Sequence, residues 1–272
     1  MRRRSSFPEP MRPKKHLGQH FLTAPYYAER IAAAIPAGPA ESVLEIGPGQ
    51  GALSVFIQKR FPGFHVVEID AEVIPVLQKK LGDGPWKLHR EDIMKFDFSH
   101  AGFPLHVAGN LPYSIGAMII RKTLMYGNRI LSCTFMVQRE VARRIVAGPG
   151  GKENGFLSIF CQFFGTPVVL FNVPPGAFFP KPAVDSSVFR MILDRNLTDK
   201  LPADSWNDFF AFVDRGFGMR RKTLVNALGR KDSKARYMNL CAELGWNPSL
   251  RPEELGVGEW LVLFRKDRAI PA

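Results

Sequence analysis

An amide, a proline and an aromatic residue stand together directly after a run that is typical of a buried strand. The run is "LHVAGN" (105–110), and Leu111, Pro112 and Tyr113 follow its last residue, Asn110. Proline cannot continue the hydrogen-bond ladder of a sheet, so the strand is expected to end here. Open α/β sheets bind their ligands at the carboxyl ends of their strands. The stretch is therefore a candidate ligand site that offers an amide and a flat ring.

A glycine-rich loop follows another predicted strand. "LEIGPGQGAL" places Glu45, Gly47, Gly49 and Gly51 between a strand at 42–47 and a helix. Glycines allow a tight turn and a close approach of the backbone to a ligand, and the first N–H groups of the helix are unpaired. Such a loop can hold a dinucleotide or another adenosine cofactor, and the loop alone does not decide between them.

Two acidic residues end the next two predicted strands. Glu68 lies near the end of the strand at 65–70, where a carboxylate can accept hydrogen bonds from both hydroxyls of a ribose. Asp92 ends the strand at 86–92, where it could accept a hydrogen bond from an adenine amine. Three such features at successive strand ends fit an adenosyl ligand that lies across the carboxyl edge of the sheet.

The elements that must position these residues follow a regular order. Strand-like and helix-like runs alternate from about 43 to 137, which predicts an α/β fold with a Rossmann-like, doubly wound parallel sheet. Runs at 165–173 and 186–193 are expected as late strands, and helical periodicity over 205–265 predicts a small all-helical C-terminal domain. The expected organisation is a basic arm with a cofactor-proximal segment at 1–22, a Rossmann-like domain at 23–195 and a helical domain at 203–268.

Several motifs resemble, in order, those of the KsgA-type ribosomal RNA adenine N6,N6-dimethyltransferases. They are "KKHLGQHFL" (14–22), "GPGQG", "VVEID", "EDIM", "GNLPYSI", "QREVARRIVAGPG" (138–150), "FFPKPAVDSSV" (178–188) and "RRKTLVNAL" (220–228). The resemblance covers roughly residues 14 to 265, and the combination of motifs is specific, whereas "GPGQG" alone is not. It implies a Rossmann-like methyltransferase domain that uses S-adenosyl-L-methionine and releases S-adenosyl-L-homocysteine.

The resemblance also implies which residues contact the cofactor. These are His20, Leu22, Glu45, Gly47, Gly49, Gly51, Glu68, Ile69, Asp92, Ile93 and Asn110. The sequence departs from the family at His20, where Asn is usual. A backbone contact would survive that change, whereas a contact through the side chain is in doubt.

For an adenine substrate the stretch 110–113 has a chemical role. The lone pair of an aromatic amine is delocalised into the ring, so the nitrogen is a poor nucleophile. The side-chain oxygen of Asn110 and the carbonyl of Leu111 can accept its two N–H bonds and favour a pyramidal nitrogen, which stabilises the transition state. Pro112 stiffens the turn, and Tyr113 can stack on the base. A sulfonium already activates the methyl group, so no dedicated strong base is required, and the sequence offers no convincing His/Asp or Cys/His pair.

The proline-rich loop at 172–186 contains two further aromatic candidates, Phe178 and Phe179. The resemblance implies that an aromatic residue here closes over the flipped base from the face opposite Tyr113, which helps to offset the cost of unstacking. Packing in the core is the alternative for either residue. The family pattern further implies two successive transfers to one nitrogen.

Charge points to a polyanionic partner. The chain carries 37 Lys and Arg against 25 Asp and Glu, a net charge of +12. Nucleic acid or an acidic membrane would suit this surplus, and a merely solvated basic surface is the plainer alternative. Basic residues cluster in the N-terminal arm, on a predicted helix and near the C-terminus. Those expected to bind RNA are Arg139, Arg143, Arg144, Arg220, Arg221 and Lys222. The resemblance to the KsgA-type enzymes implies that the partner is 16S rRNA within the immature small ribosomal subunit.

Other classes are disfavoured. The three cysteines are scattered, without CxxC or paired His, so neither a disulfide framework nor a metal site is expected. No apolar run approaches the roughly 18 residues of a membrane span, and no signal-type segment opens the chain. A monomer in the cytoplasm is expected.

Three alternative functions remain at this point. The first is an Erm-like methyltransferase that modifies 23S rRNA, although "RRKTLVNAL" and the helical tail look more like the small-subunit enzymes. The second is a relative that binds nucleic acid without catalysis, which the intact "NLPY" and both acids disfavour. The third is an NAD-dependent oxidoreductase, for which a catalytic Tyr-Lys or His-Asp constellation is missing.

Overall fold

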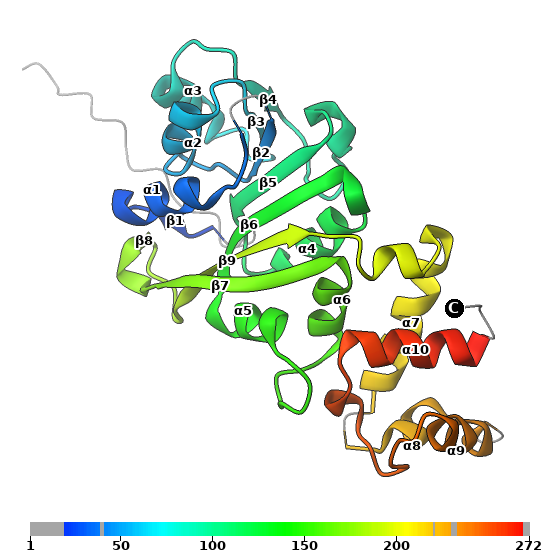
Figure 1. Ribbon diagram of the computed structural model, residues 1–272. Coiled ribbons are helices and arrows are strands. Elements are labelled where there is room, and N and C mark those ends of the chain that lie inside the picture. The colour runs from blue at the N-terminus through cyan, green and yellow to red at the C-terminus, as the bar shows by residue number, and fades with distance from the viewer. Residues whose placement is uncertain (1–18, 39–40, 220, 230–232, 269–272) are drawn as a thin grey trace, which may run out of the picture.

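A computed structural model describes residues 19–38, 41–219, 221–229 and 233–268 (Figure 1). A seven-stranded sheet with the order β4-β3-β2-β5-β6-β9-β7 forms its centre. The strands are β2 (Ser42–Ile46), β3 (His65–Val67), β4 (Lys87–His89), β5 (Leu105–Asn110), β6 (Ile130–Gln138), β7 (Gly165–Val173) and β9 (Ser186–Leu193). The five neighbouring strands β4, β3, β2, β5 and β6 are parallel to one another. Strand β9 runs antiparallel to both of its neighbours, β6 and β7. The predicted α/β sheet with a late antiparallel pair is confirmed.

Helices cover both faces of the sheet, because successive residues of its central strands point to opposite sides. Val43 and Val66 belong to the apolar cluster under the first three helices, whereas Leu44 and Val107 belong to the cluster under the next three. The first three are α1 (Pro25–Ala34), α2 (Ser54–Arg60) and α3 (Ile74–Leu81). The next three are α4 (Gly116–Leu124), α5 (Arg139–Val146) and α6 (Phe156–Phe164). The direction of strand order reverses between β2 and β5, so their carboxyl ends form the switch point where such sheets bind ligands.

Two very short strands form a second sheet. Strand β1 (Phe21–Leu22) pairs antiparallel with β8 (Phe178–Phe179), so that Phe21 is opposite Phe179 and Leu22 is opposite Phe178. Thr23 extends the pairing, because its backbone N–H donates to the carbonyl of Ala177 at 2.8 Å. The segment that precedes α1 is thereby attached to the proline-rich loop between β7 and β9.

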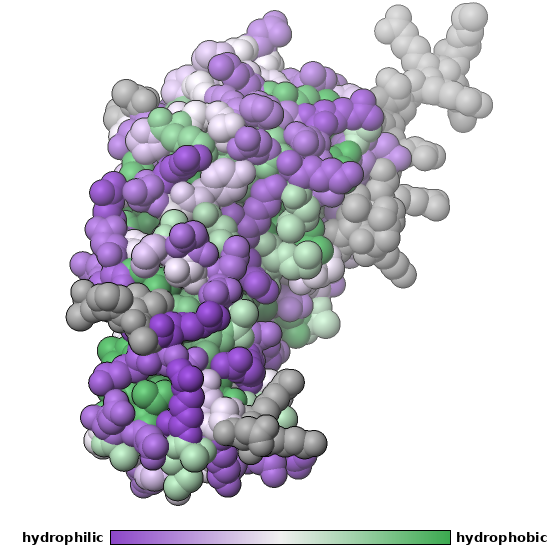
Figure 2. All heavy atoms as spheres, turned by 90° about the vertical axis from the view of Figure 1, so that its right-hand side faces the viewer, coloured by the Kyte–Doolittle hydropathy of each residue, from purple (hydrophilic) through white to green (hydrophobic). Residues whose placement is uncertain are grey.

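The chain after β9 is helical, as its periodicity predicts. It forms α7 (Trp206–Phe217), α8 (Leu224–Leu228), α9 (Lys234–Glu243) and α10 (Val257–Arg268), which stand at one end of the molecule beside α6 (Figure 1). Aromatic side chains join them to α6, and the rings of Phe160 and Phe210 are 4.3 Å apart. The face around these helices is largely hydrophilic with apolar side chains interspersed (Figure 2). The division into domains at 195–203 stays a prediction, since one apolar cluster extends from the sheet through α6 into α7 and α10.

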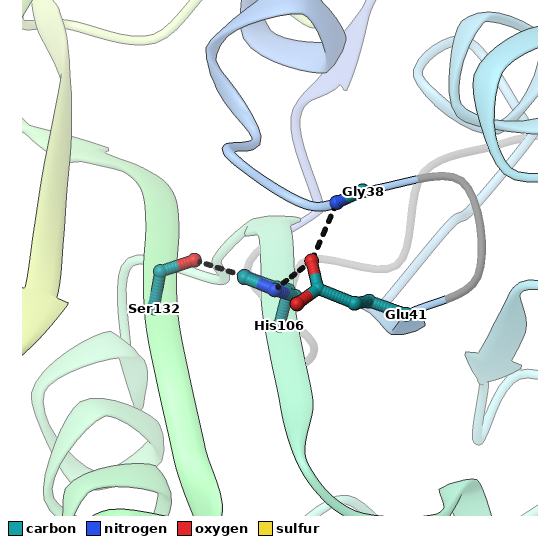
Figure 3. Close-up of polar contacts among 4 residues, drawn as sticks. All are labelled: Gly38, Glu41, His106 and Ser132. Carbon is teal, nitrogen blue, oxygen red and sulfur yellow. Dashed lines mark hydrogen bonds and ion pairs between the residues drawn. The ribbon is translucent and has the colours of Figure 1, made fainter.

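A buried polar relay joins three neighbouring segments at the amino end of the sheet (Figure 3). His106 Nε2 lies 3.1 Å from Glu41 Oε2, and its Nδ1 lies 2.7 Å from Ser132 Oγ. Burial lowers the pKa of His106, so the ring is neutral near pH 7. The Nε2–H then donates to Glu41, and Nδ1 accepts from the Ser132 hydroxyl. The arrangement resembles a catalytic triad, but Ser132 is fully buried, so the relay is structural.

Candidate active site

A cavity of about 340 Å³ opens at the carboxyl ends of β2, β3, β4 and β5. Ten of the eleven residues that were expected to contact the cofactor line it. They are His20, Leu22, Glu45, Gly47, Gly49, Glu68, Ile69, Asp92, Ile93 and Asn110. Leu111, Pro112 and Tyr113 line it as well, so the cofactor candidates and the turn after β5 share one cavity. Gly51 alone of the cofactor candidates does not line the wall.

The glycine loop has the left-handed backbone that its composition predicts. Gly47, Gly49 and Gly51 have φ angles of 63°, 53° and 75°, which non-glycine residues rarely adopt. A Cβ added to Gly49 would lie 3.1 Å from the ring of Phe21, so the loop packs directly against β1. A Cβ at Gly51 would lie 2.8 Å from a methyl group of Leu77. Gly51 therefore contributes to the packing of the loop on α3, and its expected contact with the cofactor stays a prediction.

Glu68 is held in the cavity wall by the backbone. Its Oε2 accepts from Gly49 N at 3.1 Å, and its Oε1 accepts from Asp70 N at 2.8 Å. Burial raises the pKa of Glu68, and these two hydrogen bonds oppose that rise. The carboxylate is thus oriented from both sides, and each oxygen retains capacity to accept further hydrogen bonds from a ligand.

Glu45 is the least compensated acid of the site. Its side chain is 1 % exposed, and its Oε2 has no hydrogen-bond partner within the part of the chain that the structure describes. Burial raises the pKa of Glu45 to about 8, the nearby hydroxyl of Ser54 opposes that rise, and the charge of Glu68 adds to it. A buried carboxyl group without a partner is costly, and a cation or hydrogen-bond donor in the cavity would relieve that cost. The group fits a ligand that carries positive charge.

The opposite end of the cavity suits a purine ring. Ile69 is exposed for 52 % of its surface and lies in the cavity wall, as does the buried Ile93. Asp92 lines the same cavity, and its Oδ1 accepts from the backbone N–H of Met94 at 2.9 Å. Two apolar side chains beside an oriented carboxylate can hold a flat heterocycle that carries an amine.

The amide of Asn110 has a defined orientation. Its Nδ2 donates to the carbonyl oxygen of His20 at 3.0 Å, and only the amino group of the amide can make that bond. The amide oxygen therefore points away from His20. Next along the chain, the N–H of Leu111 donates to the carbonyl of Met136 at 3.0 Å, which fixes the peptide that follows the strand. Among the described residues no donor reaches the carbonyl of Leu111.

Tyr113 is held at its hydroxyl and at its ring. The hydroxyl lies 2.6 Å from Ser186 Oγ at the start of β9, and burial raises the pKa of the phenol, which keeps it neutral. The imidazole of His20 stacks on the ring, with centroids 5.1 Å apart and planes inclined by 29°. This contact was not predicted, because no spacing rule relates a residue before the first strand to the end of β5.

The two phenylalanines of the proline-rich loop differ sharply. Phe178 is 5 % exposed and belongs to the core under α1–α3, whereas Phe179 is 56 % exposed. Neither lines the cavity itself. The burial of Phe178 fits the packing alternative, and a catalytic role for either phenylalanine stays a prediction. Phe179 alone is available to a substrate.

The expected RNA-binding arginines of α5 line a second hollow of about 800 Å³, together with Lys152. Each of them is paired with a carboxylate: Arg139 with Asp185 at 3.3 Å, Arg143 with Glu153 at 2.7 Å, and Arg144 with Glu140. The pairing with Asp185 and Glu153 could not be foreseen from the sequence, because loops bring those acids to α5. These ion pairs reduce the positive potential that the composition suggests.

The remaining basic candidates lie elsewhere. Arg221 and Lys222 are exposed just before α8. Arg220 and the N-terminal arm lie outside the described residues.

Membrane and metal features are absent from the described ranges. In 19–38, 41–219, 221–229 and 233–268, no helix is long and apolar enough to span a bilayer. The same ranges contain no cluster of three or more side chains suited to binding a metal ion. All three cysteines are buried and free.

Comparisons with known proteins agree with this site. A family model described as ribosomal RNA adenine dimethylase matches residues 11–264. A ribosomal RNA small subunit methyltransferase A from Marinobacter nauticus is 39 % identical, with 91 % of this chain and 89 % of the relative covered. One of the same name from Pseudomonas putida is 40 % identical, with 93 % and 94 % covered.

Two solved structures share the fold. A dimethyladenosine transferase from Plasmodium falciparum has a TM-score of 0.76 at 22 % identity and covers 92 % of this chain and 99 % of its own. The 23S rRNA methyltransferase ErmE has a TM-score of 0.70 at 23 % identity, with 90 % and 98 % covered. At these identities the likeness concerns the fold alone, and it does not separate one RNA substrate from another.

Proposed function

Because the chain belongs to the ribosomal RNA adenine dimethylase family, we propose that it dimethylates N6 of two adjacent adenines in the 3′-terminal hairpin of 16S rRNA. The observation that carries the proposal is the shared cavity, in which the turn at 110–113 meets the acids of the cofactor wall. Relatives that are 39 % and 40 % identical carry the name of small-subunit methyltransferases. That name favours 16S rRNA over the 23S rRNA of the Erm alternative.

The cavity fits S-adenosylmethionine, which supplies a methyl group activated by a sulfonium. Glu68 would hold the ribose hydroxyls, and Asp92 would accept from the adenine amine between Ile69 and Ile93. Among the described residues, Oε2 of Glu45 has no hydrogen-bond partner, and it would interact favourably with the positive charge of the cofactor. An acidic residue that is buried without a partner would be a liability in a protein that binds a neutral or anionic ligand here.

The residues after β5 perform the chemistry on the substrate side. The Asn110 oxygen, turned away from His20, and the Leu111 carbonyl accept the two N–H groups of the target amine. Acceptors in these positions favour a pyramidal nitrogen whose lone pair is free to attack, so they bind the transition state better than the flat amine. Proton transfer needs no histidine here, since the product amine loses its proton readily to solvent.

Aromatic side chains receive the base. Tyr113, fixed by Ser186 and His20, offers a rigid plate at the cavity, and Phe179 closes from the exposed loop. Stacking on such plates offsets the few kcal/mol that extraction of an adenine from its stack costs. Tolerance for a monomethylated amine is required, because both methyl groups go to one nitrogen.

Binding of the immature small ribosomal subunit by a monomer in the cytoplasm completes the proposal. Arg139, Arg143 and Arg144 on α5, with Arg221 and Lys222, are the contacts proposed for RNA phosphates. A non-catalytic relative is disfavoured by the oriented amide of Asn110. A nicotinamide enzyme is disfavoured because the described residues of the cavity wall include no catalytic Tyr-Lys pair.

A methyl-transfer assay tests the function. Immature 30S particles and purified 23S rRNA are incubated with the protein and tritiated S-adenosylmethionine, and the nucleosides are identified by mass spectrometry. We expect N6,N6-dimethyladenosine in 16S rRNA only. Labelling of 23S rRNA alone would assign the chain to the Erm class, and no labelling of either RNA would remove the proposal.

A further inference from the structure

The segment before α1 contacts the glycine loop, the turn after β5 and the proline-rich loop. Gln19 Nε2 donates to Asp70 Oδ2 at 2.8 Å, and the ring of Phe21 packs on Gly49. Thr23 donates to the Ala177 carbonyl through both its N–H and its hydroxyl, at 2.8 and 3.0 Å. The segment 19–23 therefore lies between the glycine loop on one side and the loop that carries Phe179 on the other.

His20 is the central residue of this segment. Its carbonyl accepts from Asn110, its ring stacks on Tyr113, and its Nδ1 lies 2.8 Å from the carbonyl oxygen of Pro180. A carbonyl oxygen only accepts, so Nδ1 must carry the proton and donate. The imidazole is thus fixed both by a directional hydrogen bond and by a ring contact, and it bridges the turn after β5 and the proline-rich loop.

Resting on the proposed function, we propose that His20 is a positioning residue for the base-binding loop. The hydrogen bond from Nδ1–H to Pro180 holds the neighbouring Phe179 at a set place relative to Tyr113. Within the described residues two residue pairs join β1 to β8, and this side-chain bond adds a contact at the position directly after Phe179. Because the loop is already ordered beside Tyr113, binding of the adenine does not have to supply the conformational entropy cost of ordering it.

Two substitutions of His20 test the ring contact with Tyr113 and the hydrogen bond to Pro180 separately. His20→Phe keeps a ring against Tyr113 and loses the donor to Pro180. His20→Asn loses the ring but can place an amide nitrogen near the position of Nδ1. Both variants keep the backbone carbonyl that holds Asn110. Tyr26→Phe, on the exposed side of α1, is the control.

Steady-state methylation of immature 30S particles gives the first readout. We expect His20→Phe to raise the KM for RNA roughly two- to tenfold, the range for loss of one hydrogen bond, with kcat within about twofold. We expect His20→Asn to restore most of the KM. An unchanged KM in His20→Phe, or equal KM values in both variants, overturns the proposal. A KM below that of the unaltered protein in His20→Asn also overturns it, since the imidazole would then obstruct the base.

Hydrogen exchange gives a second readout that does not depend on methylation. Amides of residues 177–187 should exchange faster in His20→Phe than in the unaltered protein, and at the unaltered rate in His20→Asn. Equal exchange in all variants contradicts the positioning role even if the enzyme is active. If the proposed function is wrong but the positioning role is right, the unaltered protein will not methylate the RNA, and the exchange rates of the variants will still differ as predicted.

Discussion

Asn110 donates its amino group to the carbonyl oxygen of His20 at 3.0 Å, and this single contact orients the amide that we propose as catalytic. A residue before the first strand of the main sheet thereby sets the orientation of an acceptor at the end of β5. The amide oxygen is left for the target amine, together with the Leu111 carbonyl.

Removal of this amide should stop the chemistry. Asn110→Ala is expected to lower kcat about 10²–10³-fold, the usual effect of losing one group aimed at the transition state. The affinity for S-adenosylmethionine should change little, because Glu45, Glu68 and Asp92 remain. Single-turnover methylation and calorimetry of cofactor binding check the two parts. A fully active variant would contradict the mechanism.

Cofactor affinity should depend on pH through Glu45. Since burial raises its pKa to about 8, the carboxyl group is protonated at lower pH and must lose that proton to face a cation. S-adenosylmethionine should therefore bind more tightly as pH rises from 6.5 to 8, by up to about tenfold per pH unit, and level off above. Calorimetry across this range measures the slope. Glu45→Gln should bind more weakly at pH 8.5 and lose most of the slope, and an unchanged slope would contradict the assignment.

Two substitutions of Tyr113 can distinguish the contribution of its ring from that of its hydroxyl. Tyr113→Phe loses only the bond to Ser186, so kcat/KM for RNA should fall by a few-fold. Tyr113→Ala also loses the plate, worth about 1–3 kcal/mol per stacked base, so the fall should be roughly five- to hundredfold. Steady-state kinetics on 30S particles compares them, and equal effects of the two substitutions would argue against stacking.

RNA affinity should respond to the ion pairs on α5. Glu153→Gln frees Arg143 from its 2.7 Å partner, so affinity for RNA should increase and its salt dependence should steepen by roughly 0.7–0.9 in log–log slope. Arg143→Gln should shift both in the opposite direction. Filter binding at several salt concentrations measures the slopes, with Glu243→Gln at the paired Lys266 as the control. If neither substitution changes the RNA affinity or its salt dependence, the RNA does not bind at α5.

The relay at the amino end of the sheet should affect stability without affecting catalysis. His106→Ala removes the partner of the fully buried Ser132 hydroxyl, so the free energy of unfolding should fall by about 1–3 kcal/mol or somewhat more. The kcat and KM should stay unchanged, because the relay lies at the opposite end of β5 from Asn110. Urea denaturation and steady-state kinetics test this, and His106→Gln should recover part of the stability.

The sheet and most of the cavity wall could be predicted from the sequence. The largely apolar runs at 43–46 and 105–108 alternate with helix-like runs, which favours buried parallel strands, and residues that follow parallel strands must meet at one edge. Gly47, Gly49, Glu68, Asp92 and Asn110 therefore line one cavity, whereas Gly51 does not.

Features that depend on contacts between residues far apart in the sequence could not be predicted in this way. Strands β1 and β8 contain two residues each, too few to show an alternating pattern. The difference between Phe178 and Phe179 became visible only from their burial in the folded chain. The raised pKa of Glu45 reflects complete burial, which residue order does not reveal, and the acids that pair with Arg139 and Arg143 come from separate loops.

The ladder between β1 and β8 has a consequence for anyone who wishes to redesign this protein. Because Phe21 is opposite Phe179 while also resting on Gly49, the donor pocket and the acceptor loop share one short peptide as their common wall. Grafting the 177–180 loop of a relative to change specificity should fail unless residues 19–22 of that relative are transplanted with it. The exchangeable module is thus a discontinuous pair of segments rather than a single loop.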